Sequence, residues 1–94
     1  MGPSMEIRLQ QNNIIYHKGF IKDLKKFDIH TTILLEKKLI RILKNPEMQR
    51  VKSLKNYPFA DWRLKLGDYR ILFIEDKKKQ VFIFLGIKHR KNLY

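Results

Sequence analysis

The sequence predicts an α+β domain of two layers, in which an N-terminal helical hairpin packs on one face of a small, mainly antiparallel sheet, in the order β-α-α-β-β-β. Three observations predict it. Apolar residues recur at helical spacing between residues 18 and 44, and from residue 62 onward they alternate or run together as in strands. A chain of 94 residues that is 44% hydrophobic can bury one modest core, so a single domain is expected.

The N-terminal residues are expected to divide into a remnant and a first strand. Residues 1–4 read Met-Gly-Pro-Ser, which is typical of a sequence left by cloning, so the natural start is expected at Met5 and the domain at residues 5–94. Ile7 and Leu9 alternate with polar residues, and an apolar run begins at Ile14. A polar stretch, residues 10–13, lies between them, so this pattern predicts a strand over about residues 5–16, either continuous or interrupted.

Two helices are expected next, since the apolar period changes at residue 18. Phe20, Leu24 and Phe27 stand at helical spacing, which predicts a first helix over residues 18–27. Asp28 suits the N-cap of a second helix, and Pro46 ends that helix. The second helix carries a broad apolar stripe, made of Ile33, Leu34, Leu35, Leu39, Ile42 and Leu43.

The rest of the chain is expected to form a connection and three antiparallel strands. No period is clear between residues 46 and 61, so a connection is expected there. The strands are expected at about residues 62–66, 69–75 and 80–87, where β-branched and aromatic residues are frequent. The last two strands are apolar on both faces, as central strands are.

The first two of these strands are joined by Gly67-Asp68, which suits a two-residue hairpin turn because glycine adopts a positive φ without strain. Such a turn places Lys65 directly opposite Arg70 on one face of the sheet. Like charges in this position repel, by up to about 1 kcal/mol. With Arg63 on the same face, the sheet surface away from the helices is expected to be basic.

The charge balance of the whole chain points to an acidic partner. Lysine and arginine number 21 against 9 acidic residues, which gives a net charge of +12 and a pI near 10.1. A polyanion such as RNA, DNA or the ribosome, or an acidic protein, would be attracted to this chain.

Several classes of protein are disfavoured by the sequence. The longest apolar run, residues 81–87, is too short to cross a bilayer, and no signal peptide is visible, so a soluble cytoplasmic protein is expected. The absence of cysteine excludes disulfides and thiol chemistry. His17, His30 and His89 lie far apart in the sequence, so neither a metal site nor a cofactor is expected.

Two motifs give the chain a family resemblance. The segment from Trp62 to Arg70, Trp-Arg-Leu-Lys-Leu-Gly-Asp-Tyr-Arg, and the ending Gly-Ile-Lys-His-Arg-Lys-Asn-Leu-Tyr at residues 86–94 resemble the RelE/ParE superfamily of toxin–antitoxin toxins. The resemblance covers nearly the whole chain and is strongest toward the RelE-like members. It implies a ribosome-dependent messenger RNA endonuclease that acts in the A site and inhibits translation. It also implies neutralisation by a small, acidic, RelB-like antitoxin, with a heterotetramer as one expected complex.

The resemblance also implies site residues. Arg63 and Lys65 match the two basic residues of a strand, Arg70 matches the hairpin arginine, and Tyr94 matches a terminal tyrosine. His89 matches a histidine of some relatives. The remaining C-terminal basic residues are expected to bind RNA phosphates, and they are Lys88, Arg90 and Lys91.

The chemistry of metal-free RNA cleavage agrees with these residue types. One group must take a proton from the 2′-hydroxyl, another must protonate the leaving 5′-oxygen, and cations must stabilise the phosphorane. Arg63, Lys65 and Arg70 would form the cation clamp. His89 is the first choice for proton transfer, because imidazole is the side chain that titrates nearest neutral pH. Lys65 or Tyr94 would serve instead where neighbouring cations favour loss of its proton.

Two other functions stay open on the sequence. A ParE-like inhibitor of DNA gyrase would share the fold without nuclease activity. A non-catalytic module that binds RNA or the ribosome would need only the positive charge. Trp62 also has two possible roles, packing in the core or stacking on an RNA base, and packing is expected.

Overall fold

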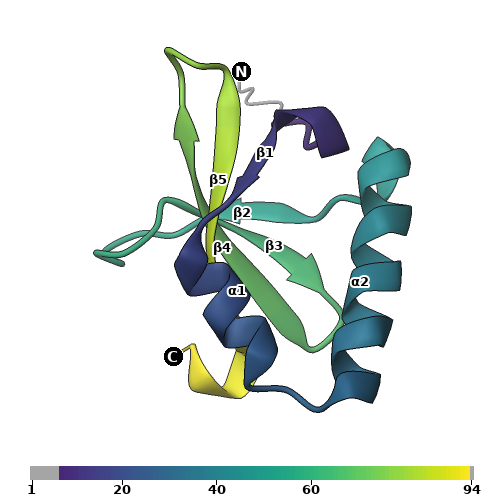
Figure 1. The fold of residues 1–94 in the computed structure, drawn as a ribbon. Coiled ribbons are helices and arrows are strands. Elements are labelled where there is room, and N and C mark those ends of the chain that lie inside the picture. Colours follow the sequence, from purple (N-terminus) through teal and green to yellow (C-terminus); the bar gives the residue numbers. More distant parts are fainter. Residues whose placement is uncertain (1–6, 94) are drawn as a thin grey trace.

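The computed structural model describes residues 7–93, which form two helices and one mixed sheet of five strands (Figure 1). The strand order is β1-β5-β4-β3-β2, with β1 parallel to β5 and all other neighbours antiparallel. The elements are α1 (Lys18–Lys25), α2 (Ile29–Lys44), β1 (Ile14–Tyr16), β2 (Val51–Ser53), β3 (Trp62–Leu66), β4 (Tyr69–Asp76) and β5 (Val81–His89). Short 3-10 helices lie at η1 (Gln11–Asn13), η2 (Pro46–Met48) and η3 (Arg90–Asn92). The predicted α+β class is confirmed.

Both helices begin at side-chain caps. The Asp28 carboxylate accepts a hydrogen bond from the Thr31 backbone N–H at 2.7 Å, as the sequence predicts for the start of α2. This bond lowers the pKa of the Asp28 carboxyl below its ordinary value, because it stabilises the ionised form. At the start of α1, Nδ1 of His17 accepts from the Gly19 N–H at 3.0 Å. No helix within residues 7–93 is long and apolar enough to span a membrane.

The first strand is much shorter than predicted, because local hydrogen bonds replace the strand before Ile14. The Gln10 N–H donates to the Asn13 side chain at 2.8 Å, and the Asn13 amide donates back to the Arg8 carbonyl at 3.1 Å. Leu9 is fully buried, and the Gln49 side chain bonds both its N–H and its carbonyl, at 3.0 and 2.8 Å. The predicted strand over residues 5–16 is therefore wrong except at β1; residues 5 and 6 lie outside the described residues.

The expected connection between residues 46 and 61 contains a strand that the sequence analysis missed. β2 pairs antiparallel with β3, and this places Lys52 opposite Arg63. A strand of three residues with a single apolar side chain, Val51, has no measurable period. The predicted connection therefore consists of η2, the strand β2 and a loop at residues 54–61 that leads to β3.

The hairpin between β3 and β4 has the predicted turn and register. Gly67 has φ +62°, while Asp68 does not have a positive φ, as in a turn that needs glycine only at its first central position. Lys65 lies opposite Arg70, and Leu66 lies opposite Tyr69. β5 continues to His89, two residues beyond its predicted end.

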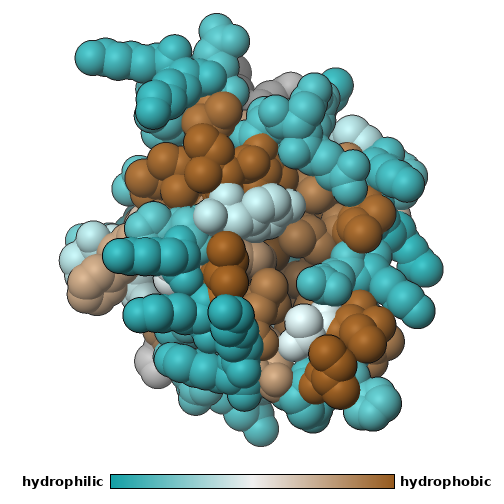
Figure 2. Space-filling view, viewed as in Figure 1, coloured by the Kyte–Doolittle hydropathy of each residue, from teal (hydrophilic) through white to brown (hydrophobic). Residues whose placement is uncertain are grey.

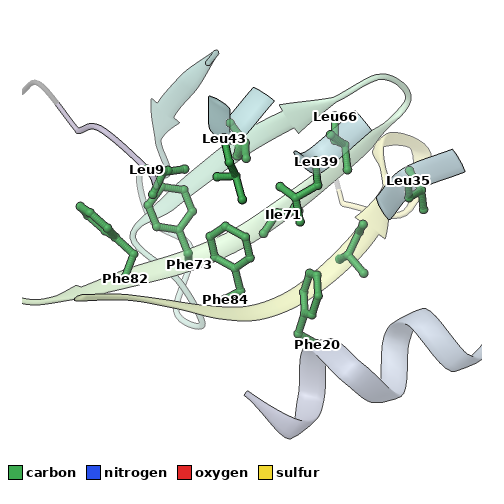
Figure 3. Close-up of a cluster of buried hydrophobic side chains, with 12 residues drawn as sticks. Leu9, Phe20, Leu35, Leu39, Leu43, Leu66, Ile71, Phe73, Phe82 and Phe84 are labelled. Atoms are coloured by element: carbon green, nitrogen blue, oxygen red, sulfur yellow. The ribbon is translucent and has the colours of Figure 1, made fainter. Parts of the chain in front are cut away.

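The core lies between the sheet and the two helices (Figure 3). Phe73 and Phe84 are fully buried in it, and their rings pack with centroids 5.8 Å apart. Phe20 of α1 packs on Phe84 at 5.6 Å. Trp62 packs against this cluster, as expected. α2 contributes an evenly spaced row of buried side chains, Leu35, Leu39 and Leu43.

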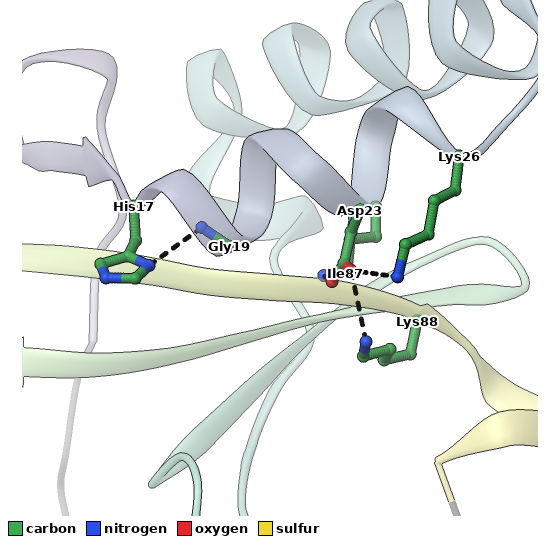
Figure 4. A network of polar contacts seen from close by, with 6 residues as sticks. All are labelled: His17, Gly19, Asp23, Lys26, Ile87 and Lys88. Atoms are coloured by element: carbon green, nitrogen blue, oxygen red, sulfur yellow. Dashed lines mark hydrogen bonds and ion pairs between the residues drawn. The ribbon is translucent and has the colours of Figure 1, made fainter.

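Helix α1 lies along the outer edge of β5 (Figure 4). β1 pairs with β5 only as far as Phe84, so the following edge groups of β5 need other partners. The buried carboxylate of Asp23 accepts a hydrogen bond from the Ile87 N–H at 2.9 Å. A Cβ on Gly86 would lie 2.9 Å from that carboxylate, so glycine allows this close approach. A side chain of α1 thereby accepts the hydrogen bond that a neighbouring strand would otherwise accept from the edge of β5.

Candidate functional site: the basic face of the sheet

Five basic side chains leave the sheet on the face opposite the helices. Their neighbours along β3, β4 and β5 are the core residues Leu64, Leu66, Ile71 and Ile87, and side chains alternate between faces along a strand. Cross-strand pairing joins the five into one group, called here the basic row: Lys52 opposite Arg63, and Lys65 opposite Arg70, which in turn lies opposite Lys88.

Most of the basic row has no acidic partner. Within residues 7–93, no ion pair involves Lys52, Arg63, Lys65 or Arg70. Neighbouring cations of this kind repel by a few tenths of a kcal/mol up to about 1 kcal/mol for each cross-strand pair. A bound anion would remove that repulsion, so the row is suited to a phosphate group.

Arg70 is the most enclosed member of the row, with 9% of its surface exposed. Its Nη1 donates to the carbonyls of Gly67 and Tyr69, at 2.8 and 2.9 Å. Its Nε is buried and has no hydrogen-bond partner in the described chain. These bonds hold the guanidinium against the β3–β4 turn, so Arg70 supplies a fixed positive charge beside Lys65.

Lys88 is the member of the basic row that has an acidic partner in the described residues. Its Nζ lies 3.3 Å from Oδ1 of Asp23, the carboxylate that also binds the edge of β5 (Figure 4). Asp23 therefore neutralises part of the charge at this end of the basic row. Asp23 is not among the predicted site residues, although its spacing from Phe20 and Phe27 places it on the apolar face of α1, where a carboxylate needs a partner.

His89 lies on the other face of the sheet. It follows Lys88 in the same strand, and its ring packs on Tyr69 with centroids 5.2 Å apart. Its Nδ1 accepts a hydrogen bond from the Lys91 N–H at 3.1 Å, which caps η3. The structure thus brings Arg63, Lys65 and Arg70 together but does not bring His89 to them.

Among the C-terminal basic residues, Arg90 is bonded to the β3–β4 turn. The Arg90 N–H donates to the Asp68 carbonyl at 2.8 Å, and Nε of Arg90 lies 3.7 Å from the Asp68 carboxylate. Lys91 is exposed in η3. Tyr94, the predicted terminal tyrosine of the site, lies outside the described residues.

A second surface feature lies on the helical side of the molecule. An open apolar groove of about 460 Å³ runs between α1 and α2, and Figure 2 shows hydrophobic side chains in the hollow between them. Its lining includes the buried Phe20 and Leu39 and the half-exposed Ile21 and Ile40. Tyr16 also lines the groove, and burial raises the pKa of its hydroxyl above the ordinary value. The groove and the basic row are on opposite sides of the sheet.

Three solved structures with a similar fold are described as toxin–antitoxin complexes. They are the RelBE2 complex from Mycobacterium tuberculosis, the RelB-RelE complex from Methanococcus jannaschii and the RelE-RelB complex from Pyrococcus horikoshii OT3. Their sequence identities are 18%, 24% and 22%, and their TM-scores are 0.65, 0.61 and 0.58. The matches cover 85%, 85% and 92% of this chain, and 92%, 94% and 99% of the matched chains. At these identities the likeness establishes the fold.

The sequence itself defines the family. A family model described as the ParE toxin of type II toxin–antitoxin system, parDE, matches residues 14–94. The chain therefore belongs to this family, within the RelE/ParE superfamily that the two motifs indicate, and it is a toxin of a type II toxin–antitoxin system. No curated protein matches the chain.

Proposed function

We propose that this toxin is a ribosome-dependent, metal-independent endoribonuclease that cleaves messenger RNA in the A site and inhibits translation in the cytoplasm. The observation that carries the proposal is the pairing of Lys65 with Arg70, beside Arg63, with no acidic partner for these three side chains in residues 7–93. A scissile phosphate bound there would be surrounded by cations that stabilise its growing negative charge.

The reaction needs no external reagent. The 2′-hydroxyl loses its proton to water as its oxygen attacks the adjacent phosphorus. The bond from phosphorus to the 5′-oxygen breaks and that oxygen takes up a proton, which leaves a 2′,3′-cyclic phosphate and a 5′-hydroxyl. Lys65 is the proposed donor of that second proton, because it lies opposite Arg70 in the basic row and its ammonium, unlike a guanidinium, can give up a proton, which water then replaces. Arg63 and Arg70 hold the phosphate and its charge. His89 would take part only after a rearrangement of η3, which it caps in this structure.

The test is cleavage of a translated messenger RNA in a purified translation system, mapped by primer extension. The wild type should cut at discrete A-site positions. Lys65→Ala should slow cleavage by about 10²- to 10⁴-fold, which is the usual contribution of a proton-transfer group. Lys37→Ala removes an exposed cation of α2 and serves as the matched control, with unchanged cleavage expected. Cleavage at the wild-type rate by both Lys65→Ala and Arg63→Ala would contradict the site.

Inhibition of DNA gyrase without RNA cleavage is the second candidate. The position of His89 favours this candidate, because the imidazole that suits proton transfer lies on the opposite face of the sheet from the basic row. A toxin of this kind would block supercoiling by purified gyrase and leave translated messenger RNA intact. Ribosome binding with neither activity would instead indicate a non-catalytic binding module.

We also propose that a cognate, acidic, RelB-like antitoxin binds the groove between α1 and α2 with an amphipathic helix or strand. The three similar structures are described as complexes of a toxin with its antitoxin. The groove offers an apolar lining, and the chain around it carries a net charge of +12. Apolar side chains of the antitoxin would fill the groove while its acidic residues face the lysines outside it. A heterotetramer of two toxins and two antitoxins would be one form of the complex.

The groove is tested by co-purification of the toxin with the product of the neighbouring gene. Ile21→Glu introduces a charge at the lining of the groove and should abolish co-purification, because a carboxylate there would lose its water on binding. Met48→Glu makes the same change at a residue that is also part-exposed but does not line the groove, and co-purification should survive. Equal retention of the partner by both variants would place the antitoxin elsewhere.

A further inference from the structure

The most exposed large apolar side chain in the described residues is Phe59, with 73% of its surface accessible. It belongs to the loop at residues 54–61 between β2 and β3, which extends away from the sheet at the left of Figure 1. The base of this loop is closed by a hydrogen bond from the Leu54 N–H to the Asp61 carbonyl at 2.9 Å. The Asp61 N–H in turn donates to the Phe73 carbonyl at 3.2 Å. The ring is therefore carried by a loop that is fastened to the central sheet.

A second aromatic ring supports Phe59. Tyr57 is half-buried, and the two rings meet edge to face with centroids 5.8 Å apart. Asn56 has φ +59°, a conformation that turns the chain, and Pro58 between the two rings restricts the backbone further. The loop thus presents an aromatic surface in a fixed position. Neither Tyr57 nor Phe59 belongs to the hydrophobic core, so packing in the core is not the role of these rings.

The loop leaves and rejoins the sheet beside two cations of the basic row. Lys52 lies two residues before the loop and Arg63 two residues after it, and the two are cross-strand partners. Lys55 is exposed within the loop, where Asp61 is the one acidic residue. An exposed ring next to cations is the arrangement by which proteins bind single-stranded RNA, since the ring stacks on a base while the cations contact phosphates.

We propose that Phe59, supported by Tyr57, is a stacking platform for an unpaired RNA base, whose neighbouring phosphates contact Lys52 and Arg63. Arg63 is four positions after Phe59, so even a fully extended chain keeps their Cα atoms within about 14 Å. The platform would guide the RNA strand onto the basic row. The inference rests on RNA being the substrate, as in the proposed function, but it does not require that the RNA be cleaved.

The test compares two probes by fluorescence anisotropy: a short, labelled single-stranded RNA and an abasic oligonucleotide with the same number of phosphates. The wild type should bind the RNA more tightly than the abasic probe. Phe59→Ala should weaken RNA binding by about 5- to 150-fold, the range for loss of one stacked base, and leave abasic binding unchanged. Phe59→Trp should restore RNA binding.

Two further variants serve as controls, one for loss of a positive charge and one for loss of an exposed apolar side chain. Lys52→Ala should weaken binding of both probes and reduce the salt dependence, because it removes a phosphate contact. Ile29→Ala truncates another exposed apolar side chain, 66% accessible at the start of α2, and should change neither. RNA binding by Phe59→Ala that equals wild type, or that falls together with abasic binding, would overturn the platform and indicate a protein contact for the loop. A wild type that prefers RNA but cuts no messenger RNA would instead refute only the nuclease.

Discussion

At the scale of single residues, Asp23 connects α1 both to the edge of β5 and to the basic row. It lies in α1, yet its carboxylate accepts the N–H of Ile87 in β5 and pairs with the Lys88 ammonium at the end of the basic row. Only 8% of its surface is exposed, and its bond with the Ile87 N–H is buried, whereas the Lys88 side chain that pairs with it is partly exposed. Lys26 lies farther away, 3.8 Å from the same oxygen as Lys88. One carboxylate therefore joins a helix, a strand edge and a cation of the candidate site.

We expect Asp23→Ala to lower the free energy of unfolding by about 1 to 3 kcal/mol, because it leaves the Ile87 N–H buried without an acceptor. Asp23→Asn keeps an acceptor oxygen and should lose less. Urea denaturation measures both differences. Glu36→Ala changes an exposed acid of α2 and should remain within about 0.5 kcal/mol of wild type. A loss no larger in Asp23→Ala than in this control would contradict the role of Asp23.

At the scale of elements, the start of α2 is set by the Asp28 cap. The bond from the Thr31 N–H stabilises the ionised carboxylate, which is why the pKa of Asp28 in the folded protein lies below its ordinary value. A group with a lowered folded-state pKa stabilises the fold at pH values above its unfolded pKa. That stabilisation is lost as the pH falls through the folded-state pKa.

The pH dependence of thermal unfolding should therefore change in Asp28→Asn. Asparagine still caps a helix but carries no charge, so the variant should lose less stability than the wild type as the pH falls from about 5 to about 2. Melting curves followed by circular dichroism at several pH values give the comparison. Parallel acid profiles of the two proteins would show that the cap does not contribute to the acid dependence.

At the scale of the whole molecule, the sheet separates two surfaces with different chemistry. The apolar groove lies on the helical side and the basic row on the other, and the two surfaces share no residue. Substitutions on one surface should then leave the other intact, as distant sites behave independently.

This separation predicts a crossed result. Ile21→Glu should fail to hold the antitoxin but still act on RNA, whereas Lys65→Ala should hold the antitoxin but fail to cleave. The measurements are co-purification and primer extension on the same two protein preparations. Loss of both activities in either variant, with an unchanged melting temperature, would show that the two surfaces are coupled.

How far the sequence predicts the molecule depends on the length and regularity of each pattern. The two helices and the three C-terminal strands have long apolar periods, and all are present. β2 has three residues and no period, while the Gln10–Asn13 hydrogen bonds end the first strand early. In the site, a two-residue turn fixes the register, so the pairing of Lys65 with Arg70 is predictable. The face of the sheet on which His89 lies is not predictable, because it depends on β5 continuing past Ile87 with regular alternation of its side chains.

The way α1 covers β5 also bears on how copies of this protein meet each other. A sheet with a bare edge invites a strand from another molecule, and repeated addition leads to fibrils. Here β1 occupies the first part of the β5 edge and Asp23 of α1 the next part, while the opposite edge of the sheet is the three-residue β2, which carries Lys52. Short edge strands with a lysine resist such addition. Gly19 of α1 and Gly86 of β5 allow the helix to lie this close to the strand, so a side chain at either position would expose the sheet to self-association as well as loosen the fold.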